Sequence, residues 1–140
     1  MVEGIANILI KRDLNEYYYK KRGISELKEK IEYLEGKKNS ISSGWKGNDW
    51  TDKLIDINAE LDMCKSNLED SIYLIDSIDR SLGILNTIEK EIINGLYLSN
   101  DEINIDQLCR KLNYSRSSIY KISDKAIYKM ALYAYGKVDC

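Results

Sequence analysis

The sequence predicts an all-α fold, because apolar residues recur at steps of three and four residues in several separate stretches. Two long stretches lie on either side of a polar segment at residues 36–50, and two shorter ones flank a turn near residue 113. The long pair predicts an N-terminal antiparallel helical hairpin of coiled-coil type over residues 1–82. The short pair predicts a C-terminal helix-turn-helix module over residues 83–140.

The first long helix is predicted from the weaker of two heptad-like seams. Its positions are Tyr17, Lys20, Ile24, Leu27, Ile31 and Leu34. The charged Lys20 interrupts an otherwise apolar pattern. We expect this helix to pair with the next one along the chain.

Residues 36–50, GKKNSISSGWKGNDW, are predicted to form the loop of the hairpin. They hold three of the eight glycines, and a loop of this length exceeds the usual connection between packed helices. Trp45 and Trp50 are either exposed aromatic contact residues or simply caps on the end of the hairpin, and both readings stay open.

The second long helix has the stronger seam. Its positions are Leu54, Ile57, Leu61, Cys64, Leu68, Ser71, Ile75, Ile78, Leu82 and Leu85. A two-helix hairpin has little interior, so this seam would expose apolar surface unless another chain or the C-terminal module covers it. We therefore expect a homodimer or a higher oligomer, with parallel and antiparallel pairing both possible.

A supporting helix is predicted over residues 86–98. Asn86 can cap its start, and Glu89, three residues later, can reach back to complete a capping box. The face expected to pack on the following helices carries Leu85, Ile88, Ile92 and Leu96.

The first helix of the proposed motif is predicted over residues 104–112. Cys109 stands where the two helices would cross and only a small side chain fits. Asn113 stands where the chain must reverse with positive φ, which asparagine accepts more readily than most residues. Ser115 is the predicted N-cap of the second helix.

The second helix is predicted to be amphipathic from Arg116 onward. The buried stripe comprises Ile119, Ile122, Ala126, Ile127 and Met130. The outer face carries Arg116, Ser117, Tyr120, Lys121, Lys125 and Lys129. Any amphipathic helix pair shows such periodicity, and outer lysines are usually only solvated. The small residue, Asn turn, Ser cap and paired isoleucines at fixed offsets nevertheless favour DNA binding.

Charge is partitioned along the chain, although the total of 21 basic and 23 acidic residues is nearly balanced. Residues 47–106 carry 4 basic and 14 acidic side chains, whereas residues 107–137 carry 7 basic side chains and only one acidic one, Asp124. Positive charge on the proposed reading helix is an electrostatic signature of phosphate binding.

The segment from Leu85 to Met130 resembles region four of bacterial sigma factors, and more closely the phage-encoded sigma-like regulators of late-gene transcription. The similarity rests on Asn86 with residues 89–91, on Cys109 and Asn113, and on Ser115-Arg116. It implies promoter-type contacts with double-stranded DNA. The family's usual charged residues are replaced here by Ser117, Ser118 and Tyr120, so its base preferences do not transfer. The candidate DNA-binding residues are Ser115, Arg116, Ser117, Ser118, Tyr120, Lys121 and Lys125.

Composition argues against enzymes and metal proteins. The chain has no histidine, no Gly-rich phosphate loop and no dinucleotide fingerprint, so we expect no catalysis, cofactor or metal. The odd and widely spaced Cys64, Cys109 and Cys140 support neither a disulfide framework nor a zinc site. No apolar run approaches the roughly 20 residues that span a bilayer, which favours a cytoplasmic protein without a membrane partner.

Three functions remain open. The favoured one is a sequence-specific transcriptional regulator of phage type, with RNA polymerase as a candidate partner of the acidic hairpin. The second is a DNA-packaging factor like a small terminase subunit, for which a large ring is expected instead of a dimer. The third is a helical scaffold that does not bind DNA.

Overall fold

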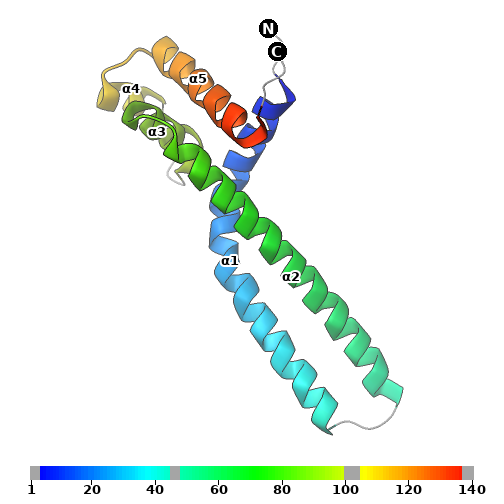
Figure 1. Ribbon diagram of the computed structural model, residues 1–140. Helices are drawn as coiled ribbons and strands as arrows, with labels where there is room; N and C mark the ends of the chain where they lie inside the picture. The colour runs from blue at the N-terminus through cyan, green and yellow to red at the C-terminus, as the bar shows by residue number, and fades with distance from the viewer. Residues whose placement is uncertain (1–3, 45–47, 100–104, 137–140) are drawn as a thin grey trace. The chain divides into compact units, whose positions relative to one another are not determined.

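The computed structural model describes residues 4–44, 48–99 and 105–136. For residues 42–44 and 48–50 it describes the backbone alone. This described part is helical and contains no strand, which confirms the predicted all-α class (Figure 1). The helices are α1 (Ile5–Gly44), α2 (Asn48–Gly83), α3 (Thr87–Ile93), the π-helical turn η1 (Asn94–Leu98), α4 (Ile105–Leu112) and α5 (Arg116–Tyr135).

The chain divides into two compact units. The first unit contains Met1–Tyr19 and Leu74–Cys140, and the second contains Lys20–Tyr73. The boundary expected after residue 82 falls inside the first unit, because the early turns of α1 and the end of α2 contribute to the same core as α5. Which region serves assembly and which serves binding stays a prediction.

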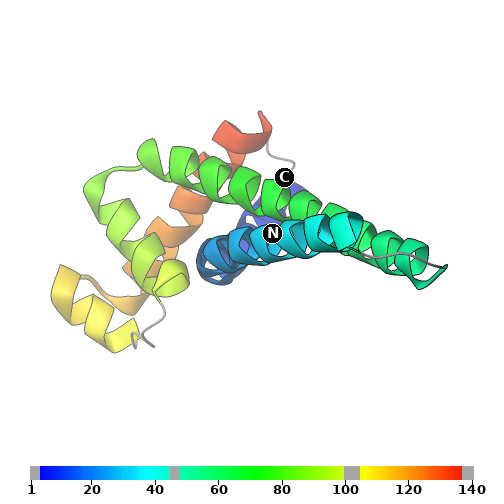
Figure 2. The same ribbon diagram turned by 90° about the horizontal axis from the view of Figure 1, so that it is seen from below.

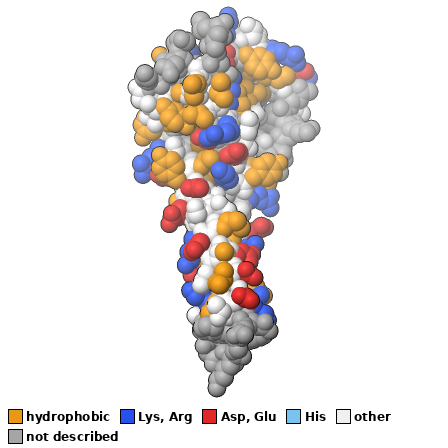
Figure 3. All heavy atoms as spheres, turned by 90° about the vertical axis from the view of Figure 1, so that its right-hand side faces the viewer, with side chains coloured by type: hydrophobic (Ala, Val, Ile, Leu, Met, Phe, Trp, Pro, Cys, Tyr) orange, Lys and Arg blue, Asp and Glu red, His pale blue; other side chains and the backbone are white. Residues whose placement is uncertain are grey.

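The second unit is held by apolar contacts between parts of α1 and α2. Its buried residues are Leu34, Ile41, Ile57, Leu61 and Cys64, with Leu27, Ile31 and Leu54 packed against them. Apart from Ile41, these are positions of the two predicted seams. Ion pairs join Lys30 to Glu60 and Lys65 to Glu35 at 3.1 Å on the surface of the two helices. Figure 3 shows acidic and basic side chains interspersed over this part of the molecule.

The prediction of a loop at residues 36–50 is wrong for most of these residues. Helix α1 continues to Gly44 and α2 begins at Asn48. Gly36 has open space around its Cα, and the buried Ile41 packs in the core of the second unit. Burial of Ile41 stabilises a helical turn that local glycine and serine content disfavours. Trp45 and the side chain of Trp50 lie outside the described residues.

The first unit has two buried cores. The larger brings together Ile10 and Leu14 of α1, Ile78 of α2, and Ile127 and Met130 of α5. The phenol of Tyr17 donates a hydrogen bond of 2.6 Å to the Oδ1 atom of Asp79 beside this core.

The smaller core of the first unit joins α3, η1, α4 and α5 (Figure 2). Ile92, Leu108 and Ile119 are buried at its centre. Around them pack Ile88, Leu96, Ile105, Cys109, Leu112 and Ile122. Three short elements thereby hold the first turns of α5, which carry most of the candidate binding residues.

Candidate nucleic-acid interface

The connection between α4 and α5 is three residues long. Asn113 has φ of 62°, and among the described non-glycine residues it alone has positive φ. The N–H of Tyr114 donates to the carbonyl of Cys109 at 3.2 Å, which closes the end of α4. The predicted left-handed asparagine is therefore confirmed. Asn113 reverses the chain in a conformation that a residue with a bulkier or branched side chain would adopt only with strain.

Ser115 begins α5 as a side-chain cap. It has extended φ and ψ, and its Oγ atom accepts a hydrogen bond of 3.2 Å from the N–H of Ser118. Its hydroxyl also donates to the Oγ atom of Ser118 at 2.9 Å. This confirms the predicted N-cap and satisfies one of the unpaired N–H groups at the helix start. Ser115 and Ser118 thus hold each other at the front of the candidate interface.

The predicted capping box of the supporting helix is also present. The N–H of Asn86 donates to Glu89 Oε1 at 3.0 Å, and the N–H of Glu89 donates to Asn86 Oδ1 at 2.8 Å. The helix occupies the expected span, but its last part, Asn94–Leu98, is π-helical. A Cβ atom on Gly95 would meet the Leu108 side chain at 3.1 Å, so glycine here permits a close approach to α4.

Glu89 has a second partner that sequence reasoning missed. The Nζ atom of Lys129 lies 2.9 Å from Glu89 Oε2 and 3.1 Å from Oε1, so the pair links α3 to α5. Only 5% of the Glu89 side chain is exposed. Burial tends to raise the pKa of Glu89, but the hydrogen bonds from Lys129 and Asn86 and the charges of Lys129 and Lys125 outweigh it and lower the pKa. Lys129 lies on the exposed side that periodicity predicted, with 46% of its side chain exposed, while its ammonium group pairs with Glu89.

The candidate binding residues lie together on the early turns of α5. Most of them are exposed, namely Ser115, Arg116, Ser117, Tyr120, Lys121 and Lys125. Ser118 is half-buried by its bonds with Ser115. The opposite face of α5 carries Ile119, Ile127 and Met130, which are almost completely buried. The amphipathic division predicted for this helix is therefore present.

Arg116, the first residue of α5, forms an ion pair with Asp106 of α4. The Nη2 atom of Arg116 donates to Asp106 Oδ1 at 3.1 Å, and the two side chains remain 60% and 54% exposed. This contact crosses the turn between the two helices. The sequence contains no periodic signal for it, because the partners are ten residues apart and lie on different helices.

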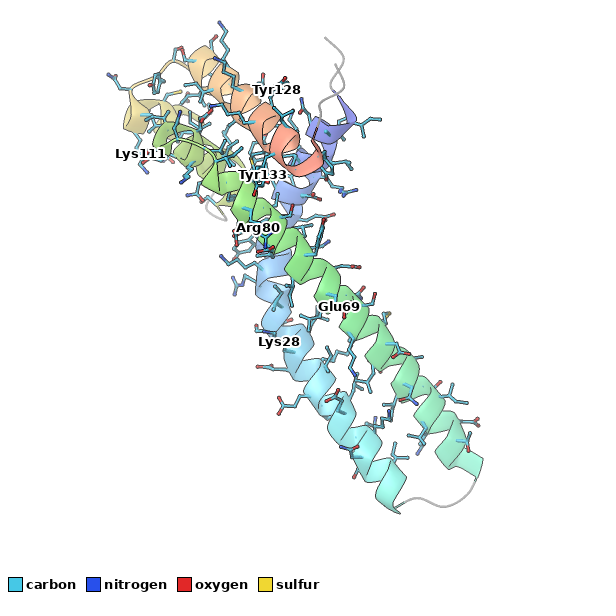
Figure 4. The ribbon with its side chains drawn as sticks, in the orientation of Figure 1. Lys28, Glu69, Arg80, Lys111, Tyr128 and Tyr133 are labelled. Atoms are coloured by element: carbon cyan, nitrogen blue, oxygen red, sulfur yellow. The ribbon has the colours of Figure 1, made fainter. Side chains whose placement is uncertain are left out.

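Charge around this site is mainly positive. Exposed basic residues on α4 and α5 include Arg110, Lys111 (labelled in Figure 4), Lys121 and Lys125. Within residues 105–136 the acidic side chains are Asp106 and Asp124. Such a surface attracts phosphate groups.

Farther along α5 the exposed side chains are largely apolar or aromatic. They comprise Tyr128, Leu132, Tyr133 and Tyr135, of which Tyr128 and Tyr133 are labelled in Figure 4. The positive character of the helix surface is thus concentrated in its first half.

The described residues were also compared with the requirements of a membrane span and of a metal site. No helix among them is both long enough and apolar enough to cross a membrane. No group of three or more His, Cys, Asp or Glu side chains in that part of the chain could hold a metal ion. Cys64 is buried and Cys109 is half-buried, both as free thiols, while Cys140 is outside the described residues.

No protein-family model, curated protein or solved structure matches this chain.

Proposed function

We propose that the chain is a sequence-specific DNA-binding transcriptional regulator of phage type, which reads the major groove with α5. The observation that carries this proposal is the exposed set of Arg116, Tyr120 and Lys121 on the first turns of a helix held from behind by a buried core. In this proposal α4, the turn at Asn113 and α5 act as a helix-turn-helix, supported by α3.

The dimensions of the two surfaces are compatible. An α-helix with its side chains is about 10–12 Å across, and the major groove of B-form DNA is about 12 Å wide. The first turns of a recognition helix reach base edges, while neighbouring basic residues contact phosphates. In this proposal Arg116, Tyr120 and Lys121 contact base edges, and Lys125 with the hydroxyls of Ser115 and Ser117 contacts phosphates.

The second unit is proposed to act as an antiparallel coiled-coil hairpin that joins copies of the chain. The hairpin is supported by the seam at Ile57, Leu61 and Cys64, which is buried between α1 and α2. The joining of copies is supported by apolar side chains that α2 leaves exposed, namely Met63, Ile72 and Tyr73. A homodimer would place two reading helices on one DNA site. The acidic outer residues of α2 are the candidate contact with RNA polymerase.

A helical scaffold that does not bind DNA is the second candidate. It is favoured by the second unit, whose apolar seam and ion pairs are complete within α1 and α2 and require no nucleic acid. In that case the basic residues of α5 would be solvated surface.

Selection from a pool of random duplexes, at two salt concentrations and with sequencing of the bound fraction, tests the proposal. An enriched motif whose binding weakens steeply with salt is the expected result, and two-fold symmetry in the motif would indicate a dimer. Binding without enrichment would contradict sequence-specific reading, and no binding at either salt would favour the scaffold. The mass of the oligomer separates a dimeric regulator from a ring-forming packaging factor.

A further inference from the structure

The ion pair between Asp106 and Arg116 joins the two helices that flank the turn of the candidate interface. One bond connects them, from Arg116 Nη2 to Asp106 Oδ1 at 3.1 Å. Arg116 is the first residue of α5, where a recognition helix comes nearest to base edges. The pair therefore controls where a guanidinium lies at the most sensitive point of the proposed interface.

Asp106 has more than one physical effect at this place. As an acidic residue in the first turn of α4 it favours the start of that helix, whereas the exposed ion pair itself contributes little to the free energy of folding. Asp106 also places a negative charge on a surface whose other charged residues are mainly basic, which weakens attraction to phosphate.

The ion pair also orients the side chain of Arg116. A guanidinium has five N–H donors, and the bond to Asp106 uses one of them. The others can form two parallel bonds to a base edge, and O6 and N7 of guanine are the acceptors that match this fork. A carboxylate on a different helix restrains a long side chain that would otherwise sample many rotamers before binding.

We propose that Asp106 is a positioning residue that sets base selectivity at the base pair contacted by Arg116. The inference rests on the proposed DNA-binding function and deepens it, because it separates selectivity from affinity. Removing Asp106 should strengthen binding to DNA in general, since a negative charge is lost, and should weaken discrimination at one base pair.

The experiment compares the full-length wild-type chain with Asp106→Ala, Asp106→Glu and Asp124→Ala. Asp124→Ala is the matched control, because it removes one exposed negative charge from α5 without removing an ion pair with arginine. Dissociation constants are measured for the selected duplex and for duplexes in which each base pair is changed in turn. Discrimination is the ratio of the dissociation constants of one variant for two duplexes. A partly unfolded variant changes both constants by the same factor, so this ratio stays the same.

Asp106→Ala is expected to lose about two- to fivefold of the discrimination at one base pair, because an exposed ion pair imposes only a small preference on the arginine side chain. Asp106→Glu should restore much of this discrimination. Asp124→Ala should discriminate at that base pair as well as the wild type does. Arg116→Ala should lose discrimination at the same base pair, with no further loss when Asp106→Ala is added.

Unchanged discrimination in Asp106→Ala, with a motif still enriched by the wild type, would overturn this inference and leave the proposed function standing. A uniform loss over all base pairs would also overturn it, because a general structural role acts on every contact alike. If the wild type enriches no motif, the proposed function itself fails and the inference fails with it.

Discussion

The second unit and the α3–α5 part of the first unit are both helical, but they depend on different kinds of residue. The second unit is held by a repeated apolar seam, in which Ile57, Leu61 and Cys64 do similar work at successive turns. The α3–α5 part depends on single residues with individual geometry, such as Asn113 at positive φ and Glu89 between two partners. Substitution of one apolar residue by another of similar size should therefore change the stability of the seam only slightly. Substitution of the individually placed residues in the α3–α5 part should change stability more.

The largest expected effect is at the centre of the smaller core. Ile119 is fully buried, so Ile119→Ala should lower the free energy of unfolding by about 2–5 kcal/mol and weaken DNA binding. The exposed Ile55 of α2 is the matched control, and Ile55→Ala should change stability by less than about 0.5 kcal/mol. Urea unfolding followed by circular dichroism measures both. Similar losses for the two variants would contradict the burial of Ile119 at the centre of this core.

A smaller loss is expected at the ion pair between α3 and α5. Glu89→Gln weakens the bond to Lys129 and should cost about 1–3 kcal/mol, because the substitution removes the negative charge from a nearly buried acceptor of a charged hydrogen bond. Glu91→Gln, on the same helix, is the control and should have little effect. Thermal unfolding of the two variants at neutral pH compares them directly.

The same ion pair predicts a direction for the pH dependence of stability. The pKa of Glu89 is lowered from its ordinary value of 4.5, so its contribution is present above that value and is lost as pH falls through the lower, folded-state pKa. The stability difference between wild type and Glu89→Gln should thus shrink below pH 4.5. A difference that stays constant down to the acid limit would contradict the lowered pKa.

The turn should respond to backbone conformation rather than to packing. Asn113→Ala should cost about 1 kcal/mol, because alanine in the left-handed region lacks the local compensation available to asparagine. Asn113→Gly should be neutral or slightly stabilising, since glycine adopts positive φ freely. The unfolding midpoints of the two variants, each compared with that of the wild type, measure this difference. Equal destabilisation by both would indicate that the asparagine side chain, not its φ, is what matters.

The smallest effect is expected on the surface of the second unit. Lys30 and Glu60 form an exposed ion pair, so Glu60→Gln should leave the unfolding midpoint essentially unchanged at physiological salt. Leu61→Ala in the neighbouring seam is the comparison and should lower stability clearly, since Leu61 is buried. A large loss from Glu60→Gln would show that this unit, too, depends on individual polar contacts.

Local sequence rules predicted the features that depend on near neighbours. The capping box at Asn86 and Glu89, the left-handed Asn113 and the N-cap Ser115 each depend on residues within a few positions of one another. Periodicity likewise predicted the burial of Ile57, Leu61, Cys64 and Ile119, because helical spacing alone places such residues on one face.

Contacts between distant residues were not predicted. Residues 36–44 are helical although their glycine, asparagine and serine residues disfavour a helix, and packing of Ile41 in the core outweighs that local preference. Lys129 is exposed as periodicity predicted, but its ion pair with Glu89, 40 residues away on another helix, has no periodic signal in the sequence.

The sequence by itself determined the helical class, the positions of the caps and the turn, and the faces that are buried, since these follow from spacing and short-range hydrogen bonding. Tertiary structure alone decided that Glu89 meets Lys129, that Asp106 holds Arg116, and that Gly95 lies against Leu108. Each of those contacts joins different helical elements, and its geometry exists only once the helices have packed.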